Sequence, residues 1–269
     1  MNRICAALVL CIMGVPLWAD ARVTVLMDVM QIDDVIDILY QEGLEHGETL
    51  NRDLLDGQGG DVWAQQVRDL YDPQRIETGL RTALSDGLEP DEIEAATAFY
   101  ASQAGTEIVA SENRARRLMS DAGIPSAARE LVAQTRQENP ALYAMVENYI
   151  GANGLIENNV AASMSQQHRF FLGLSDGGYT ERTEADILDE VWQMRDPLTA
   201  ETRDWLFGYL VLAYIGLPQD DLDAYLAFSR SEAGQALNAA LFNGFGTVFR
   251  DVSYGLGRAV ALHATRDEL

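Results

Sequence analysis

Apolar residues recur at helical spacing along most of this chain, and the strict alternation that marks strands is absent. The first such segment has its apolar residues three or four positions apart, at Val25, Val29, Ile32, Ile36 and Leu39. A second segment follows a glycine-rich turn at 56–60 and ends before Pro73, because proline disfavours helix in the residue that precedes it. The pattern predicts an all-α fold.

Later segments continue this helical pattern. Asn139-Pro140 combines a helix end with a helix start, so we expect a boundary near 135–140. One long helix is expected over 140–172, followed by a loop at 175–178. From Trp205 to Leu217 the chain is apolar almost without a break, which predicts a helix that is buried on all sides and too short to span a bilayer.

One pattern of residues occurs twice, about 129 positions apart. Residues 87–105 read GLEPDEIEAATAFYASQAG, and residues 216–234 read GLPQDDLDAYLAFSRSEAG. An internal repeat of this kind predicts one supersecondary unit that is used twice. We therefore expect two tandem, similar antiparallel helical bundles packed together, formed by residues 22–138 and 139–269.

The residue types of the repeat suit a capped corner between two helices. Acidic residues at the start of the first helix complement its dipole, a serine can cap the second helix, and small residues let the backbones approach. The predicted structural residues are Ala98, Phe99, Ser102, Ala104 and Gly105 in the first copy, and Ala227, Phe228, Ser231, Ala233 and Gly234 in the second. The serines are not assigned as nucleophiles, because no histidine lies near them and Gly-x-Ser-x-Gly is missing.

Small residues are also spaced by four in the last predicted helix. They form two rows, Ala236, Ala240 and Gly244, then Ser253, Gly257 and Ala261. Such rows predict close packing on another helix, either within the chain or across a dimer. Arg250 and Asp251 argue against a membrane span in this segment.

The motifs resemble a known family. Residues 99–105, FYASQAG, resemble the signature of a bacterial family catalogued as domain of unknown function 2059, and residues 228–234, FSRSEAG, follow the same pattern. Gln103 and Glu232 stand where that family often has proline, and Ser229 replaces its tyrosine. The resemblance implies an exported, all-α protein without an established activity, so it supplies no catalytic residues.

The first residues read as an export signal. Arg3 precedes an apolar run from Ile4 to Leu17, and Ala19 and Ala21 occupy the positions that a signal peptidase reads. We expect a signal peptide at 1–21, cleaved after Ala19 or Ala21, and export to the periplasm of a Gram-negative bacterium.

Composition excludes several kinds of chemistry and partner. Cys5 and Cys11 both fall within the expected signal, so the mature chain would have neither disulfides nor reactive thiols. Every basic side chain is arginine, which excludes lysine Schiff bases and the phosphate loop that ends in Gly-Lys. The formal net charge of −23 opposes binding to nucleic acid. We expect no nucleic-acid partner and no membrane span after signal removal. We expect an unidentified protein partner in the cell envelope, and the sequence is also compatible with a homo-oligomer.

Histidines and acids supply the candidate reactive groups. Glu42 and His46 are four positions apart, a spacing that suits two metal ligands, but no third ligand is evident and no metal site is predicted. His168 would line a polar cleft or lie on a surface turn, and His263, near the C-terminus, is given no role. A glycan hydrolase would need two carboxylates at a defined separation, and the spacing selects no pair among Glu147, Glu157, Asp186, Asp189 and Glu190.

Two polar groups of residues have two interpretations each. The first group interrupts an apolar stripe and consists of Asn148, Asn153, Asn158, Asn159, Ser163 and Ser165. These residues would either line a ligand cavity or face water, and we favour the second interpretation. The other, Arg114, Arg116 and Arg117, would pair with surface acids, as we favour, or dock an acidic partner.

The sequence therefore predicts no catalytic, cofactor-binding or metal-binding residues and no cofactor. The function that fits best is a non-catalytic, envelope-associated interaction or helper protein. A carboxylate-dependent hydrolase of an envelope glycan and a carrier of a small ligand are the alternatives.

Overall fold

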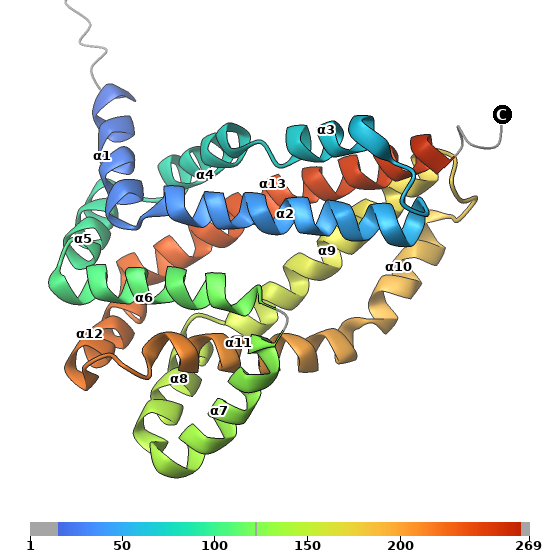
Figure 1. The fold of residues 1–269 in the computed structure, drawn as a ribbon. Helices are drawn as coiled ribbons and strands as arrows, with labels where there is room; N and C mark the ends of the chain where they lie inside the picture. The colour runs from blue at the N-terminus through green and yellow to red at the C-terminus, as the bar shows by residue number, and fades with distance from the viewer. Residues whose placement is uncertain (1–15, 122, 265–269) are drawn as a thin grey trace, which may run out of the picture.

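The computed structural model describes residues 16–121 and 123–264 (Figure 1). Every regular element in these residues is an α-helix, so the predicted all-α class is confirmed. The helices are α1 Pro16–Val29, α2 Ile32–Leu54, α3 Gly60–Leu70, α4 Pro73–Gly87, α5 Pro90–Tyr100, α6 Gln103–Met119, α7 Ile124–Glu138, α8 Pro140–Ala152, α9 Leu155–Asp176, α10 Glu184–Gln193, α11 Arg195–Tyr214, α12 Gln219–Ser229 and α13 Glu232–Ala264.

Local signals explain where several of these helices begin. The Asp72 side chain accepts a hydrogen bond from the backbone N–H of Gln74 (3.2 Å), and Pro73 then starts α4. Asn139 does the same at the start of α8, where its side chain accepts from the N–H of Leu142 (3.2 Å). These caps satisfy backbone donors that a helix start leaves without partners, and they place the boundary between α7 and α8 where the sequence predicts one.

Two segments with helical spacing of their apolar residues are each divided into two helices. Residues 140–172 form α8 and α9 rather than one helix, because Gly154 adopts a left-handed conformation with φ 57°. A similar break separates α1 from α2 at Gln31, with φ 51°. A left-handed residue cannot continue a right-handed helix, so the prediction of one long helix over 140–172 was wrong, and the first helical segment is divided for the same reason.

The helices of the two halves interlock. α4 of the first half packs against α13 of the second, and α11 of the second half packs against α6 of the first. Figure 1 shows α13 running through the molecule beside α2 and α4. The predicted all-α class is therefore correct, but the finer prediction of two tandem bundles is not confirmed, because helices far apart in the chain share these contacts.

α9 and α13 cross with their backbones in direct contact. A Cβ atom built at Gly257 would overlap the carbonyl oxygen of Phe170, and one at Gly173 would overlap that of Tyr254. Gly257 belongs to a row of small residues that the sequence analysis identified. The crossing fixes how far apart these two helices lie, and they form two walls of the cleft described below.

The two repeated motifs form corners with the same hydrogen bonds. Ser102 Oγ accepts from the N–H of Gly105 (3.1 Å) and donates to the carbonyl of Phe99 (2.6 Å). In the second copy, Ser231 Oγ accepts from the N–H of Gly234 and donates to the carbonyl of Phe228, at the same two distances. The rings of Phe99 and Phe228 stack on each other, with centroids 4.5 Å apart. The corners thus meet face to face between the halves.

The predicted signal peptide lies mostly outside the described residues. Its expected cleavage sites, after Ala19 or Ala21, fall within α1, whose later residues Val23 and Leu26 are fully buried. Cleavage there would leave these core residues in place. Among the described helices, none combines the length and apolar character that crossing a membrane requires.

Candidate functional site

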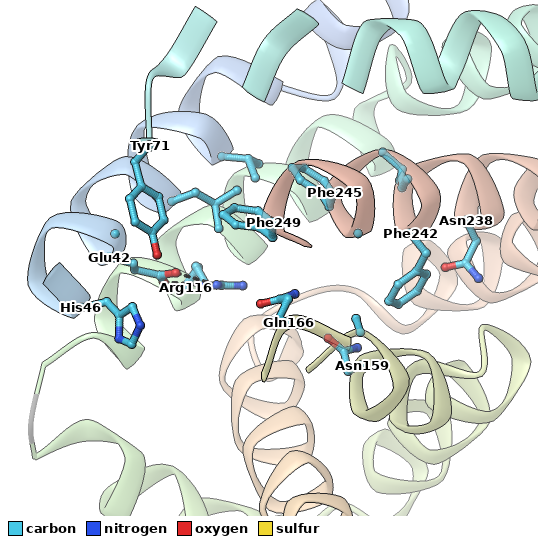
Figure 2. A pocket seen from close by; sticks show the side chains of 16 residues that line it. Glu42, His46, Tyr71, Arg116, Asn159, Gln166, Asn238, Phe242, Phe245 and Phe249 are labelled. Atoms are coloured by element: carbon cyan, nitrogen blue, oxygen red, sulfur yellow. Dashed lines mark hydrogen bonds and ion pairs between the residues drawn. The ribbon is translucent and has the colours of Figure 1, made fainter. Parts of the chain in front are cut away.

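A cleft with a volume of about 490 Å³ lies between α2, α6, α9 and α13, and we call it the central cleft (Figure 2). α2 and α6 come from the first half of the chain, and α9 and α13 come from the second. Its size and its place between helices are typical of binding sites for small molecules.

One part of the central cleft is apolar and aromatic. α13 contributes four residues at helical spacing, Leu241, Phe242, Phe245 and Phe249. The centroids of Phe245 and Phe249 are 6.3 Å apart, and Tyr71 lies 6.2 Å from Phe249. Val35 and Leu39 of α2 extend the same surface. An apolar ligand would remove this surface from water, which is favourable.

A paired carboxylate and guanidinium form the polar end of the cleft. Arg116 donates from Nε and Nη2 to the two carboxylate oxygens of Glu42, each at 2.7 Å (Figure 2). The guanidinium also lies over the ring of Trp205, 5.2 Å from its centroid. A bidentate pair of this kind is a strong charge-assisted interaction, so the two charges compensate each other within the lining.

His46 lies one turn after Glu42 on α2 and is exposed where several cavities meet. The surrounding protein still displaces enough water to lower the pKa of its imidazole below 6.5, so the ring is uncharged at neutral pH. Glu42 is engaged by Arg116 and is not free to ligate a metal beside His46. In the parts of the chain that the structure describes, no group of three or more His, Cys, Asp or Glu residues could hold a metal ion.

Amide side chains complete the polar lining. Asn159 and Gln166 come from α9, and Asn238 comes from α13 (Figure 2). The Asn159 amide nitrogen donates to the carbonyl of Leu155 (2.8 Å), and that of Asn238 donates to the carbonyl of Asn153 (3.0 Å). One of the two N–H donors of each amide is therefore used, and each asparagine keeps its second N–H and its carbonyl oxygen for a further hydrogen bond.

The two copies of the repeat contribute side chains of opposite polarity to this region. At the offset that separates the motifs, three polar residues of α6 correspond to three apolar residues of α13: Glu112 to Leu241, Asn113 to Phe242, and Arg116 to Phe245. These residues line the central cleft or the cavity next to it. The same helical positions thus make a polar surface in one half and an aromatic surface in the other.

A smaller cavity of about 210 Å³ adjoins the central cleft and contains Glu112. Val35, Asn238, Leu241 and Phe245 line both spaces. We call this smaller space the Glu112 cavity. Because the two linings share residues, a ligand in the central cleft would lie next to the Glu112 cavity.

Tyrosines from three helices of the second half surround the Glu112 carboxyl. Tyr214 donates to its Oε1 at 2.5 Å and Tyr225 donates at 3.2 Å, while the hydroxyls of Tyr149 and Tyr225 are 2.6 Å apart. Burial raises the pKa of Glu112 to about 7, and the two tyrosine hydrogen bonds lower it only in part. The carboxyl therefore joins the halves through hydrogen bonds and can exchange a proton near neutral pH.

Replacing Glu112 with glutamine is expected to change how stability depends on pH. The folded-state pKa of about 7 exceeds the ordinary value of 4.5, so the unfolded chain loses this proton first and wild-type stability falls as pH rises between these values. Glutamine does not titrate, so the variant should gain roughly 2 kcal/mol relative to the wild type between pH 5 and pH 8. Urea unfolding at both pH values measures this gain, and an offset that does not vary with pH would contradict it.

The predicted motif residues lie beside the Glu112 cavity rather than in the central cleft. Phe228 and Gly234 line the Glu112 cavity, and Phe99 stacks on both Phe228 and Tyr225. Ser102 and Ser231 are exposed and are occupied by the cap hydrogen bonds. The motif thus shapes the packing around Glu112.

Three polar residues of the second half line cavities, although the sequence analysis favoured a solvent-facing role. Asn159 lines the central cleft, Ser163 lines a neighbouring cavity at His46, and Asn153 lines the Glu112 cavity. The preference for a wet surface was therefore wrong for these three residues, and the cavity alternative describes them correctly.

The candidate hydrolytic acids do not converge on the cleft. Asp186 forms a capping box with Thr183, Glu190 pairs with Arg182, and Glu147 lines a separate shallow groove. Glu157 and Asp189 are exposed. None of the five lines the central cleft or the Glu112 cavity, so this part of the structure offers no pair for glycan hydrolysis.

The remaining predicted residues have packing or pairing roles. Arg116 pairs with Glu42 and Arg117 with Asp34 (3.0 Å), as the ion-pair interpretation requires. His263 contradicts the expectation of no role, because its ring meets Trp63 edge-on, 5.8 Å away, and its Nε2 lies 2.9 Å from Gln66 Oε1.

His168 does not line the central cleft. Its Nε2 is enclosed without a hydrogen-bond partner, 3.8 Å from a Glu184 oxygen. This placement supports neither the polar-cleft interpretation nor a simple surface turn.

Glu112 and its tyrosines were missed by sequence reasoning. The only available signal was the position of Glu112, which corresponds to an apolar residue, Leu241, in the other copy. A charged side chain at a position that is apolar in a repeat indicates either exposure or a buried polar partner. That comparison would have selected Glu112 for attention.

The comparisons with known proteins bear on the first motif. Residues 74–134, from α4 into α7, match the model of a family described as uncharacterized protein conserved in bacteria (DUF2059). The resemblance stated from residues 99–105 is therefore confirmed for this segment, and the family that it matches has no described activity. That the second motif is another copy of it stays a prediction. No curated protein and no solved structure matches the chain.

Proposed function

We propose that this is a non-catalytic binding protein that holds a small amphipathic ligand in the central cleft. The observation that carries the proposal is that one cleft combines an aromatic surface, mainly from α13, with a polar surface, mainly from α2, α6 and α9. A ligand with both apolar and polar parts would satisfy both surfaces at once.

Two features of the lining favour binding over catalysis. Among the described residues that line the central cleft, Glu42 is the only one with a carboxylate, and Arg116 holds it, so it is poorly placed to act as a base. Glu112 has a pKa suited to proton transfer, but its Oε1 accepts two tyrosine hydrogen bonds, and its cavity has no histidine or second carboxylate among the lining residues that the structure describes.

We further propose that the protein is exported and acts in the bacterial cell envelope. Arg3, the apolar run that follows it and the alanines at 19 and 21 support this location. A protein partner there is compatible with ligand binding. On α10, Leu188 and Trp192 lie four positions apart and are 51% and 65% exposed, so they offer an apolar surface to such a partner.

A fluorescence titration tests the proposed binding. N-phenyl-1-naphthylamine is apolar, uncharged and carries one N–H donor, and its emission rises in an apolar site. We expect saturable binding of one molecule per chain, with displacement by a single-chain amphiphile below its micelle-forming concentration. A linear, non-saturating signal would contradict a defined cleft and would remove the binding proposal.

A further inference from the structure

We propose that the central cleft selects an uncharged amphiphile: a single apolar chain whose polar end carries hydroxyl or amide donors. This inference rests on the proposed binding function and names its ligand class. It follows from three properties of the lining, namely its compensated charges, its amide hydrogen-bonding groups and its aromatic wall.

The charges of Glu42 and Arg116 compensate each other, so neither is left to pair with an ionic head group. Glu42 receives two hydrogen bonds from Arg116 at 2.7 Å, and Arg116 is also covered by Trp205. A charged ligand would have to give up water and gain no counter-ion in return, and that transfer is costly. An anion would meet Glu42, and a cation would meet Arg116.

No other described residue that lines the central cleft supplies a charge. His46 is neutral at pH 7 and above, because its pKa is lowered by loss of water. The other polar residues of the lining are the amides Asn159, Gln166 and Asn238 and the phenol of Tyr71, whose pKa is raised to about 12 by burial. The chain as a whole carries a formal charge of −23, which further opposes an anionic ligand.

The hydrogen-bonding groups that the amides of the lining offer include both donors and acceptors. One N–H of Asn159 and one of Asn238 donate to backbone carbonyls at 2.8 Å and 3.0 Å, so the second N–H and the Oδ1 atom of each residue remain for a ligand. Gln166 adds a further amide on the same face of α9 (Figure 2). Hydroxyl and amide groups on a ligand both donate and accept, so they would satisfy both kinds of group, whereas an ether or ester alone could only accept.

The aromatic wall accounts for the apolar part of the ligand. Phe242, Phe245 and Phe249 follow one another along α13 opposite the α9 amides (Figure 2). Burying apolar surface against these rings contributes roughly 25 cal/mol for each Å² removed from water. A chain laid along α13 would lie opposite these amides, so polar groups of the ligand would be within their reach.

A series of ligands with one chain length and different head groups tests the inference. Monododecanoylglycerol, dodecanoate and dodecyltrimethylammonium are each titrated at pH 8 against bound N-phenyl-1-naphthylamine, below their micelle-forming concentrations. We expect the glycerol ester to displace the probe with an affinity at least tenfold higher than either ion. If either ion binds as tightly as the ester, the inference is wrong, while the proposed binding function stands.

Two variants of the ion pair test its physical cause. Glu42→Gln leaves the Arg116 charge uncompensated, so dodecanoate should bind at least fivefold more tightly than it does to the wild type. Arg116→Gln leaves the Glu42 charge uncompensated, so dodecyltrimethylammonium should gain by a similar factor. If one variant does not fold, the other variant and the wild-type ligand series still test the inference.

The two proposals fail in different ways. If charge preference does not change in the folded variants, the argument from compensated charge is wrong. If neither the probe nor any of the three amphiphiles binds the wild type, both the inference and the proposed function are wrong.

Discussion

Replacing Gly257 with alanine is expected to destabilise the protein by about 3 kcal/mol, because its Cβ would enter the backbone of α9. That atom would overlap the carbonyl oxygen of Phe170 and lie 3.0 Å from the nitrogen of Leu174. Neither is part of a side chain that can rotate away. On the facing helix, a Cβ at Gly173 would lie 2.9 Å from the nitrogen of Arg258, so the contact is tight from both directions.

Gly246→Ala is the matched control for this prediction. Gly246 lies on the same helix, and its nearest neighbour to a new Cβ is the end of the Arg250 side chain at 3.7 Å. Alanine should stabilise this position by roughly 0.5–1 kcal/mol through helix propensity. Urea unfolding of the two variants measures the difference. Equal stabilities would show that α9 and α13 do not depend on a close crossing.

Alanine at Gly234 or Gly105 is expected to destabilise the protein by about 2 kcal/mol in each case. A Cβ at Gly234 would overlap the carbonyl oxygen of Phe228, and one at Gly105 would overlap the carbonyl oxygen of Phe99. The same carbonyls accept the serine hydroxyls of the two corners. Moving either corner to relieve the overlap would therefore also disturb its cap.

Thermal and urea unfolding of both corner variants, with Gly151→Ala as the control, test this expectation. Gly151 lies in α8 with nothing within 4 Å of a new Cβ, so its replacement should not destabilise the protein. Similar losses at Gly105 and Gly234 would support two equivalent corners. A loss at one corner and none at the other would contradict that equivalence.

Sequence reasoning succeeded where the determining interactions are local. Helical spacing of apolar residues identifies an all-α chain, and Asn139-Pro140 marks a helix boundary, because caps and proline act within one turn. The small residue Gly257 indicated a close helix crossing. It did not identify α9 as the packing partner, because a row of small residues predicts that another helix packs closely but does not predict which helix.

The cleft could not be predicted, because its contacts join distant parts of the chain. Arg116 and Glu42 are 74 positions apart, and Tyr214 and Glu112 are 102 positions apart. Periodicity carries no information about such pairs. The break at Gln31 was missed for another reason: a left-handed residue is usually glycine or asparagine, and glutamine gives no such signal.

The fold and the proposed function are linked through α13. Its glycine contact with α9 sets the spacing of two cleft walls, and its aromatic residues form the apolar surface. The polar surface comes from α2 and α6 of the other half and from α9. A rigid crossing on one side of the binding space would pre-form the site, which reduces the entropy lost when a ligand binds.

The most direct test of the central claim is to fill the cleft without damaging the fold. Gly246 lines the central cleft, and its Cβ position is open, so Gly246→Leu should place a side chain in the ligand space while keeping or raising stability. Gly151→Leu makes the same change on α8, away from the central cleft. We predict that N-phenyl-1-naphthylamine binds Gly246→Leu at least tenfold more weakly than the wild type and binds Gly151→Leu with unchanged affinity. Wild-type affinity in a folded Gly246→Leu variant would contradict binding in this cleft.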